Sequence, residues 1–214
     1  MPNIFIPSQE GRLEAKYHDT KGPVSLLLHA HPLFSGNMNN QIMYQLYWEL
    51  ATYGNTVVRF NFRGVGQSEG EFSGEDGELS DANTVLDWAM AAFPGREFNV
   101  IGFSFGAWVG ANLSARRPEI KKFVAISPPV GFYSFGFMTE FCSAKCLFVV
   151  GTEDNVVSVS SVAELLFVLR AQNSQGDFLM ETIEGANHFF DESMKGLVTT
   201  VRGFIDSEAN SPAS

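Results

Sequence analysis

Three residues whose types can together hydrolyse an acyl bond stand far apart along the chain: Ser104, Asp154 and His188. A serine hydroxyl is a weak nucleophile until a histidine takes its proton, and a carboxylate holds and orients that histidine. The order serine, aspartate, histidine is one in which such triads occur. The pattern indicates nucleophilic attack on a carbonyl carbon, provided that the fold brings the three side chains together.

The serine lies in the sequence IGFSFG, between the apolar run FNVI and the helix-like run AWVGANLSARR. The motif G-x-S-x-G is weak alone, but here it falls where a strand passes into a helix, as a nucleophile elbow requires. Gly102 and Gly106 remove side chains that would collide in so tight a turn. We expect the backbone N–H of Phe105 to lie at the positive end of the new helix, where it can bind an oxyanion.

The partners of the serine follow later strands. Asp154 comes after the apolar run CLFVV, and His188 comes after FLMETI. Glu153 is the alternative acid; Asp154 is preferred because it lies deeper in the loop, directly before NVV. His18 lies in an early hairpin, away from the carboxyl ends of the expected parallel strands.

The segment LLLHAHPLFSGNMNN contains two further histidines, both before the serine in the chain and so in the wrong order for the base. The loop after this first parallel strand is the usual source of the second oxyanion donor. Because Pro32 has no N–H, we expect the donor to be the backbone N–H of Leu33. His29 and His31 then shape the loop; the alternative, an H-x-H metal pair, has no third ligand at a recognisable spacing, and we expect no metal.

Strands and helices alternate along the chain and would position these loops at one edge of a sheet. A hairpin within 3–18 is followed by expected strands at 24–28, 56–62, 98–103, 123–127, 146–150 and 178–183 and expected helices at 38–53, 81–92, 106–117, 159–171 and 192–207. Continuous apolar strands separated by helices indicate a mainly parallel sheet with helices on both faces. Ligands bind such sheets at the carboxyl ends of the strands.

Composition limits the possible partners. The length of 214 residues suits one domain, expected at 1–208, with a flexible tail at 209–214. The net charge of -10 repels nucleic acid and anionic membranes. Because neither a signal-type N-terminus nor an apolar run of about 18 residues occurs, we expect a cytoplasmic protein without a membrane partner. The oligomeric state is open, a homodimer included.

Two clusters have structural explanations and a functional alternative. Cys142 and Cys146 are expected to be reduced residues of an apolar segment, the alternative being a redox pair. The acidic loop QSEGEFSGEDGE is expected to be solvated, with its last carboxylates at a helix N-terminus, the alternative being a cation site.

The segments HAHPLFSGNMNN, RFNFRGVGQSEGEF, GFSFGAW, GTEDNVV and GANHFF together resemble the small α/β-hydrolase superfamily proteins of bacteria, close in size to the dienelactone hydrolases. The resemblance covers most of residues 26–190 and implies an α/β-hydrolase fold with a triad at Ser104, Asp154 and His188. It also implies that Arg63 ties loops together. Two features depart from the pattern: dienelactone hydrolases carry cysteine at the elbow, and a His-Pro pair replaces the His-Gly of many esterases.

Capped members of the superfamily insert a lid where this chain has only PPVGFYSFGFMTEFCSAK, so we expect no cap domain. Phe132, Phe135 and Phe137 in that interval either line an acyl pocket or close the core. The expected function is that of a serine hydrolase, carboxylesterase-like, acting without a cofactor on an ester or thioester with a small to medium acyl group. The alternatives are an amidase or peptidase with the same triad, and a small-molecule-binding protein that retains the fold without catalysis.

Overall fold

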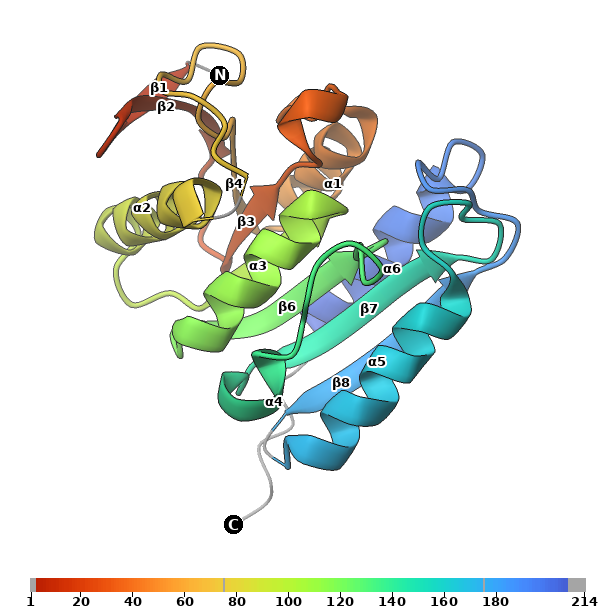
Figure 1. Ribbon diagram of the computed structural model, residues 1–214. Helices are drawn as coiled ribbons and strands as arrows, with labels where there is room; N and C mark the ends of the chain where they lie inside the picture. The colour runs from red at the N-terminus through yellow and green to blue at the C-terminus, as the bar shows by residue number, and fades with distance from the viewer. Residues whose placement is uncertain (1–2, 75, 175, 208–214) are drawn as a thin grey trace.

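The computed structural model describes residues 3–74, 76–174 and 176–207, and its strands form one eight-stranded sheet in the order β1-β2-β4-β3-β5-β6-β7-β8 (Figure 1). The hairpin of β1 and β2 joins the sheet antiparallel, and the strands from β4 to β8 run parallel. The strands are β1 (Ile4–Ser8), β2 (Gly11–His18), β3 (Val24–Leu28), β4 (Thr56–Phe60), β5 (Phe98–Phe103), β6 (Ile120–Ile126), β7 (Lys145–Gly151) and β8 (Asp177–Ile183).

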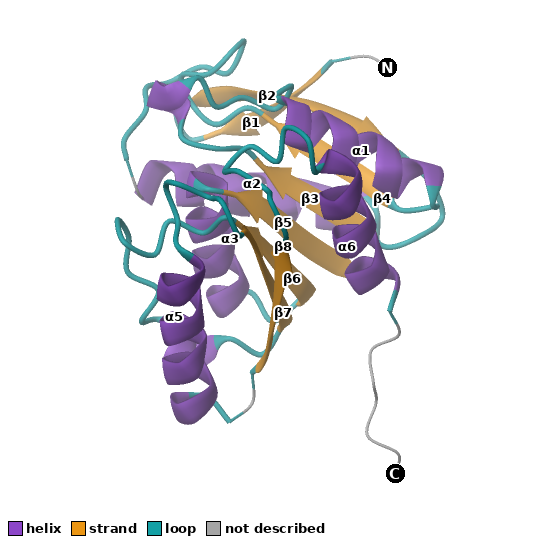
Figure 2. Cartoon of the chain, turned by 90° about the vertical axis from the view of Figure 1, so that its right-hand side faces the viewer, coloured by secondary structure: helices purple, strands orange, loops and turns teal. Residues whose placement is uncertain are grey.

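Helices cover both faces of this sheet (Figure 2). One face packs against α1 (Gln41–Thr52) and α6 (Met194–Asp206). The other packs against α2 (Asp76–Ala92), α3 (Phe105–Arg116) and α5 (Val159–Gln172), with the short α4 (Met138–Phe141) beside them. Every residue of β3, β4 and β5 is buried, which explains why their sequences are largely apolar. The expected α/β-hydrolase architecture, with an N-terminal hairpin and no cap domain, is confirmed.

Among the element boundaries that differ from the expectation, two were obscured by charged residues. The α2 helix begins at Asp76, since the Glu78 carboxylate accepts hydrogen bonds from the backbone N–H groups of Ser73 and Gly74 and ties the preceding loop to the first turn. Strand β6 begins at Ile120 although two lysines follow it. The second, Lys122, is buried, and its ammonium group donates to the Phe204, Ile205 and Ser207 carbonyls at the end of α6.

The acidic loop is less solvated than expected. Glu78 and Asp81 are fully buried, with Asp81 paired to Arg63 and Glu78 bound to the loop backbone. Glu69 is exposed and pairs with Arg12. The last carboxylates therefore lie at the start of α2, as expected, but Glu78 and Asp81 are buried rather than solvated, because the loop folds back over this end of the helix.

Three remaining expectations concern the thiols, the membrane and the tail. Cys142 and Cys146 are free and buried, with their sulfur atoms 3.5 Å apart. Across the described ranges, no helix combines the length and the apolar character needed to cross a membrane. The tail expected at 209–214 lies outside the described residues.

Candidate active site

Ser104 occupies the turn between β5 and α3 with φ 52° and ψ −118°. A non-glycine residue rarely adopts a positive φ, and such strain persists only where the surrounding structure imposes it. A Cβ at Gly102 would collide with the Gly106 carbonyl, and one at Gly106 would collide with the Leu28 carbonyl. The Ser104 N–H donates to the Ile126 carbonyl over 2.9 Å, which ties the turn to the end of β6. The geometry is that of the sharp strand-to-helix turn that a nucleophile elbow requires.

Asp154 and His188 are brought together from the loops after β7 and β8. His188 Nδ1 lies 2.9 and 3.1 Å from the two carboxylate oxygens of Asp154, whose side chain is fully buried. Burial raises the pKa of Asp154, but hydrogen bonds from His188 and from the Val157 N–H outweigh it, so the net pKa lies below its ordinary value. Asp154 is therefore ionised at neutral pH. Glu153, the alternative acid, is exposed.

The His188 ring lies close to the elbow. Its centroid is 5.2 Å from that of Phe103, the residue directly before Ser104. Nδ1 faces Asp154, which leaves Nε2 available for a proton. Among the described residues no hydrogen bond joins the Ser104 hydroxyl to His188. Catalytic hydrogen bonds are often long in ligand-free structures and tighten when substrate binds.

The loop that was expected to bind an oxyanion, residues 31–36 and called the oxyanion loop below, differs from the expectation in one respect. The Leu33 N–H is not free: it donates to Nδ1 of His31 over 3.2 Å, as part of a short 3-10 helix, Pro32–Phe34, capped by His31. Burial lowers the pKa of His31, which keeps the ring neutral and able to accept this hydrogen bond. Phe105 is the first residue of α3, so its N–H is among those that a helix leaves without an intrahelical acceptor.

His29 shapes the loop from beneath, as expected. Its Nε2 accepts a hydrogen bond from the Phe62 N–H over 3.1 Å, and its Nδ1 donates to the Ala30 carbonyl over 2.7 Å. Complete burial lowers its pKa to about 4. Since both ring nitrogens are used and the ring is neutral, His29 has no lone pair left for a metal.

The structure places the three phenylalanines Phe132, Phe135 and Phe137, for which an acyl pocket and core packing were the two expectations, in different surroundings. Phe135 is buried in the core, and Phe137 stacks on it with ring centroids 6.3 Å apart. Phe132 is exposed. None of the three lines either cavity beside the oxyanion loop. The alternative explanation fits: two of these rings close the core, because the segment folds back over α3 and α5.

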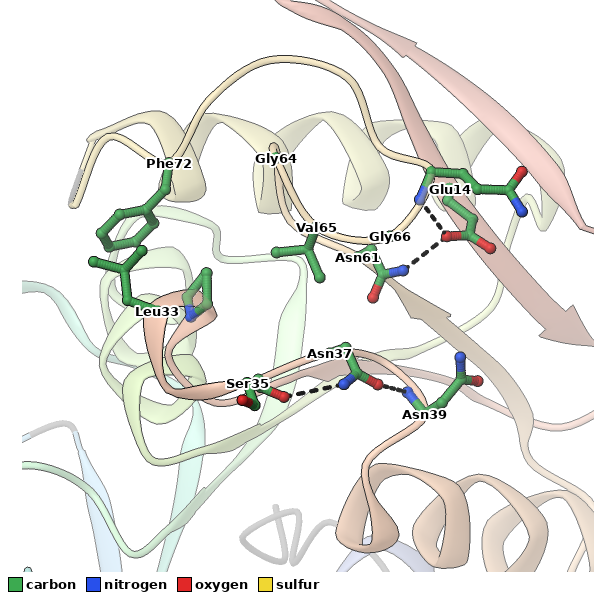
Figure 3. Close-up of a pocket in the computed structure, with 13 residues that line it drawn as sticks. Glu14, Leu33, Ser35, Asn37, Asn39, Asn61, Gly64, Val65, Gly66 and Phe72 are labelled. Atoms are coloured by element: carbon green, nitrogen blue, oxygen red, sulfur yellow. Dashed lines mark hydrogen bonds between the residues drawn. The ribbon is translucent and has the colours of Figure 1, made fainter.

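Two cavities flank the oxyanion loop. The larger, here called the polar cavity, has a volume of about 540 Å³ (Figure 3). It carries the side chains of Glu14, Asn37, Asn39, Asn61, Gln67 and Phe72 beside the loop residues Pro32, Leu33, Ser35 and Gly36. The smaller, here called the apolar cavity, has a volume of about 130 Å³ and includes Phe34, Phe103 and Phe189. Sequence reasoning missed both; the asparagines of GNMNN were the available signal.

Comparison with known proteins agrees with the fold. The family model described as alpha/beta hydrolase fold matches residues 23–142. An uncharacterised protein of Rickettsia prowazekii is 43% identical over 197 residues, covering 89% of this chain and 82% of its own length. The lysophosphatidylserine lipase ABHD12 of Rattus norvegicus is 31% identical over 122 residues, covering 56% of this chain but only 30% of its own length.

Solved structures resemble the chain over almost its whole length. A putative alpha/beta hydrolase of unknown function from Agrobacterium tumefaciens has a TM-score of 0.89 and 39% identity, covering 96% of this chain and 95% of its own. A protein of Xanthomonas campestris described as a serine hydrolase without a lid has a TM-score of 0.84 and 26% identity, covering 97% and 96%. With the elbow, the strand order and the family match in agreement, this chain belongs to the α/β-hydrolase fold family.

Proposed function

We propose that the protein is a serine hydrolase that cleaves a carboxylic ester or thioester. Ser104 is the nucleophile, His188 the general base and acid, and Asp154 the carboxylate that orients His188. The observation that carries the proposal is the strained elbow at Ser104, held between two glycines that a Cβ would not permit. Strain of this kind is characteristic of functional sites, because it lowers stability and must be maintained by the surrounding structure.

The proposed reaction has two halves. The Ser104 oxygen bonds to the carbonyl carbon while its proton passes to Nε2 of His188, and the carbonyl electron pair moves to the oxygen. The intermediate collapses, and the alcohol or thiol leaves with the proton from His188. Water then attacks the acyl-enzyme by the same route and releases the acid. The ionised Asp154 stabilises the imidazolium that forms in both halves.

Two backbone N–H groups would stabilise the oxyanion. The Phe105 N–H lies at the N-terminus of α3, where partial positive charge gathers. The Leu33 N–H would give up its hydrogen bond to Nδ1 of His31 and donate to the oxyanion instead. This exchange is favourable because hydrogen bonds to charged acceptors are about twice as strong as those between neutral groups.

An ester is preferred to an amide as the substrate. The partial match to relatives named as lipases supports ester cleavage, although it covers only 30% of the rat protein. An amidase or peptidase with the same three residues remains the alternative. Anilides in the substrate panel separate the two activities.

The test combines covalent labelling with hydrolysis. We expect a fluorophosphonate probe to label Ser104, and we expect the protein to cleave p-nitrophenyl acetate. Ser104→Ala should lose labelling and retain less than about 1% of the hydrolysis while remaining folded, because it removes one oxygen atom and loss of the nucleophile disables the whole triad. Asp154→Asn should also lower kcat, with Glu153→Gln as its exposed control. A folded protein that is neither labelled nor active would contradict the proposal and favour a binding role.

A further inference from the structure

The polar cavity has the size of a ligand site, since such sites usually measure about 300–1,000 Å³. Its volume is about 540 Å³, and its wall includes Leu33, the proposed oxyanion donor. Its lining exposes polar and apolar surface in about equal parts, and the polar part consists of amide, carboxylate and hydroxyl groups. The polar side chains are those of Glu14, Ser35, Asn37, Asn39, Asn61 and Gln67.

One wall of the cavity is a fixed array of polar groups (Figure 3). Asn61 is buried; its side-chain oxygen accepts from the Met38 N–H over 2.8 Å, and its NH2 group donates to Glu14 over 2.8 Å. The same Glu14 oxygen accepts from the Gln67 N–H over 2.9 Å. Gly66, at φ 59°, allows the loop backbone to lie directly against Asn61, because a Cβ at this position would collide with the Asn61 amide. These hydrogen bonds thus stabilise the negative charge of the Glu14 carboxylate and hold it in one orientation.

Other groups on the wall remain available. The Asn37 side chain is engaged, since its oxygen accepts from the Asn39 N–H and its NH2 group donates to the Ser35 carbonyl. The side-chain amides of Asn39 and Gln67 are exposed, and within the described ranges they form no hydrogen bond. Each offers both donors and an acceptor. Phe72 adds a flat apolar surface at the end of the cavity near the loop (Figure 3).

We infer that the polar cavity binds a neutral polyhydroxylated part of the substrate, of the sugar or glycerol type. Hydroxyl groups both donate and accept, which matches the free amides of Asn39 and Gln67, and the C–H face of a sugar matches the ring of Phe72. This inference rests on the proposed function, because it assigns the substrate class of that same site.

Other ligand classes fit less well. Among the residues that the structure describes, no lysine or arginine lines the cavity. Glu14 and the net charge of -10 both repel a phosphate or carboxylate. A long acyl chain would strip water from amides without replacing their hydrogen bonds. An organic cation gains little from Glu14, whose carboxylate already accepts hydrogen bonds from Asn3, Asn61 and the Gln67 N–H.

The position of the cavity divides the substrate into two arms. The polar and apolar cavities share Ser35 and Gly36, so the oxyanion loop lies between them. The apolar cavity contains the rings of Phe103 and Phe189, which also pack beside His188. A carbonyl held at Leu33 would direct its polyhydroxylated arm to one side and a small apolar arm to the other.

The test measures kcat/KM for matched esters. One series is glyceryl monoacetate and 6-O-acetyl methyl glucoside against butyl acetate and cyclohexylmethyl acetate; a second series is p-nitrophenyl gluconate against p-nitrophenyl hexanoate. We expect kcat/KM to be about tenfold or more higher for the polyhydroxylated member in at least one series. A site that hydrogen-bonds a substrate hydroxyl binds an analogue without that hydroxyl less well, because its polar groups are then left unpaired. Asn39→Leu and Gln67→Leu should each reduce this ratio about threefold or more. Gln45→Leu, at an exposed glutamine of α1 outside the cavity, should leave the ratio unchanged.

Binding without turnover gives an independent measurement. Saturation-transfer NMR with methyl glucoside should show contact in the wild type and in Ser104→Ala, and the signal should weaken in Gln67→Leu but not in Gln45→Leu. If p-nitrophenyl acetate is cleaved but neither series shows a preference, or an acetyl glycerol phosphate is preferred, the inference fails and the proposed function stands. If Ser104 is unlabelled and no ester is cleaved while methyl glucoside still binds, the proposed function fails alone. Absence of both the preference and the NMR signal overturns the inference.

Discussion

The two histidines of the HAHP segment, His29 and His31, have different roles. His29 is completely buried and uses both ring nitrogens, whereas His31 is half-buried and lends one nitrogen to the Leu33 N–H. Both are neutral in the folded protein, because burial lowers the pKa of each. The depressed pKa of His29 links the stability of the fold to pH.

We expect His29 to destabilise the fold in acid. The unfolded chain takes up the proton near the ordinary pKa of about 6.5, whereas the folded protein takes it up near pH 4. Between these values the free energy of unfolding should fall as pH falls, by about 3 kcal/mol in total. His29→Gln should be less stable at pH 7 but lose less stability on acidification. Urea unfolding from pH 7 to pH 4 measures this; parallel pH profiles for the two proteins would contradict it.

Among the contacts between secondary-structure elements, a buried ion pair joins the loop after β4 to the helix α2. The Arg63 guanidinium lies 2.8 Å from the Asp81 carboxylate, with side chains that are 9% and 0% exposed, and the Arg63 N–H donates to the same carboxylate. This is the loop-tying role that the resemblance implied for Arg63. The pair also positions the loop that carries Gly66 and Phe72 into the polar cavity.

Replacing one member of this ion pair should lower the free energy of unfolding more than the loss of the pair's interaction alone, because a buried charge is left without a partner. Arg63→Met leaves the buried Asp81 charge uncompensated and should lower the free energy of unfolding by about 3–5 kcal/mol, as should Asp81→Leu. The double variant should be clearly more stable than the sum of the two losses predicts. Guanidinium denaturation of all four proteins measures the coupling. Strictly additive losses would show that Arg63 and Asp81 act independently.

In the molecule as a whole, the candidate site is open to solvent. Between β6 and β7 the described chain forms only the short α4 and its flanking turns. The similar structure from Xanthomonas campestris is described as having no lid. Leu33, Phe34 and Phe189 beside the two cavities are 71%, 81% and 57% exposed. Because the described residues leave this apolar rim uncovered, a dissolved substrate would reach the proposed site directly.

Short-chain aryl esters should therefore be cleaved with simple saturation. No conformational opening is needed, so the rate should not jump when the substrate concentration passes its solubility limit. The measurement is the initial rate for p-nitrophenyl butyrate and tributyrin across that limit, with light scattering to locate it. A strong jump, or a preference for long-chain triglycerides, would show that another segment covers the site.

Much of the fold could be predicted because its signals are local. The bounds of β3 and β5 follow from apolar runs, and the elbow follows from glycines two residues either side of Ser104. The loops that carry Asp154 and His188 were identifiable because each directly follows a strand. In a parallel sheet such strand ends meet at one edge, so alternation alone indicates where these side chains gather.

The tertiary structure alone decided what depends on contacts between distant segments. The Glu14–Asn61 pair that builds the polar cavity joins residues of different strands and loops, and the burial of Phe135 depends on how its segment folds back over α3 and α5. The Leu33 N–H has a partner only because the 3-10 turn sets the His31 ring over it. Residue type and periodicity determine which face an element buries. They do not determine which polar groups meet across the chain, because that depends on the packed positions of elements far apart in sequence.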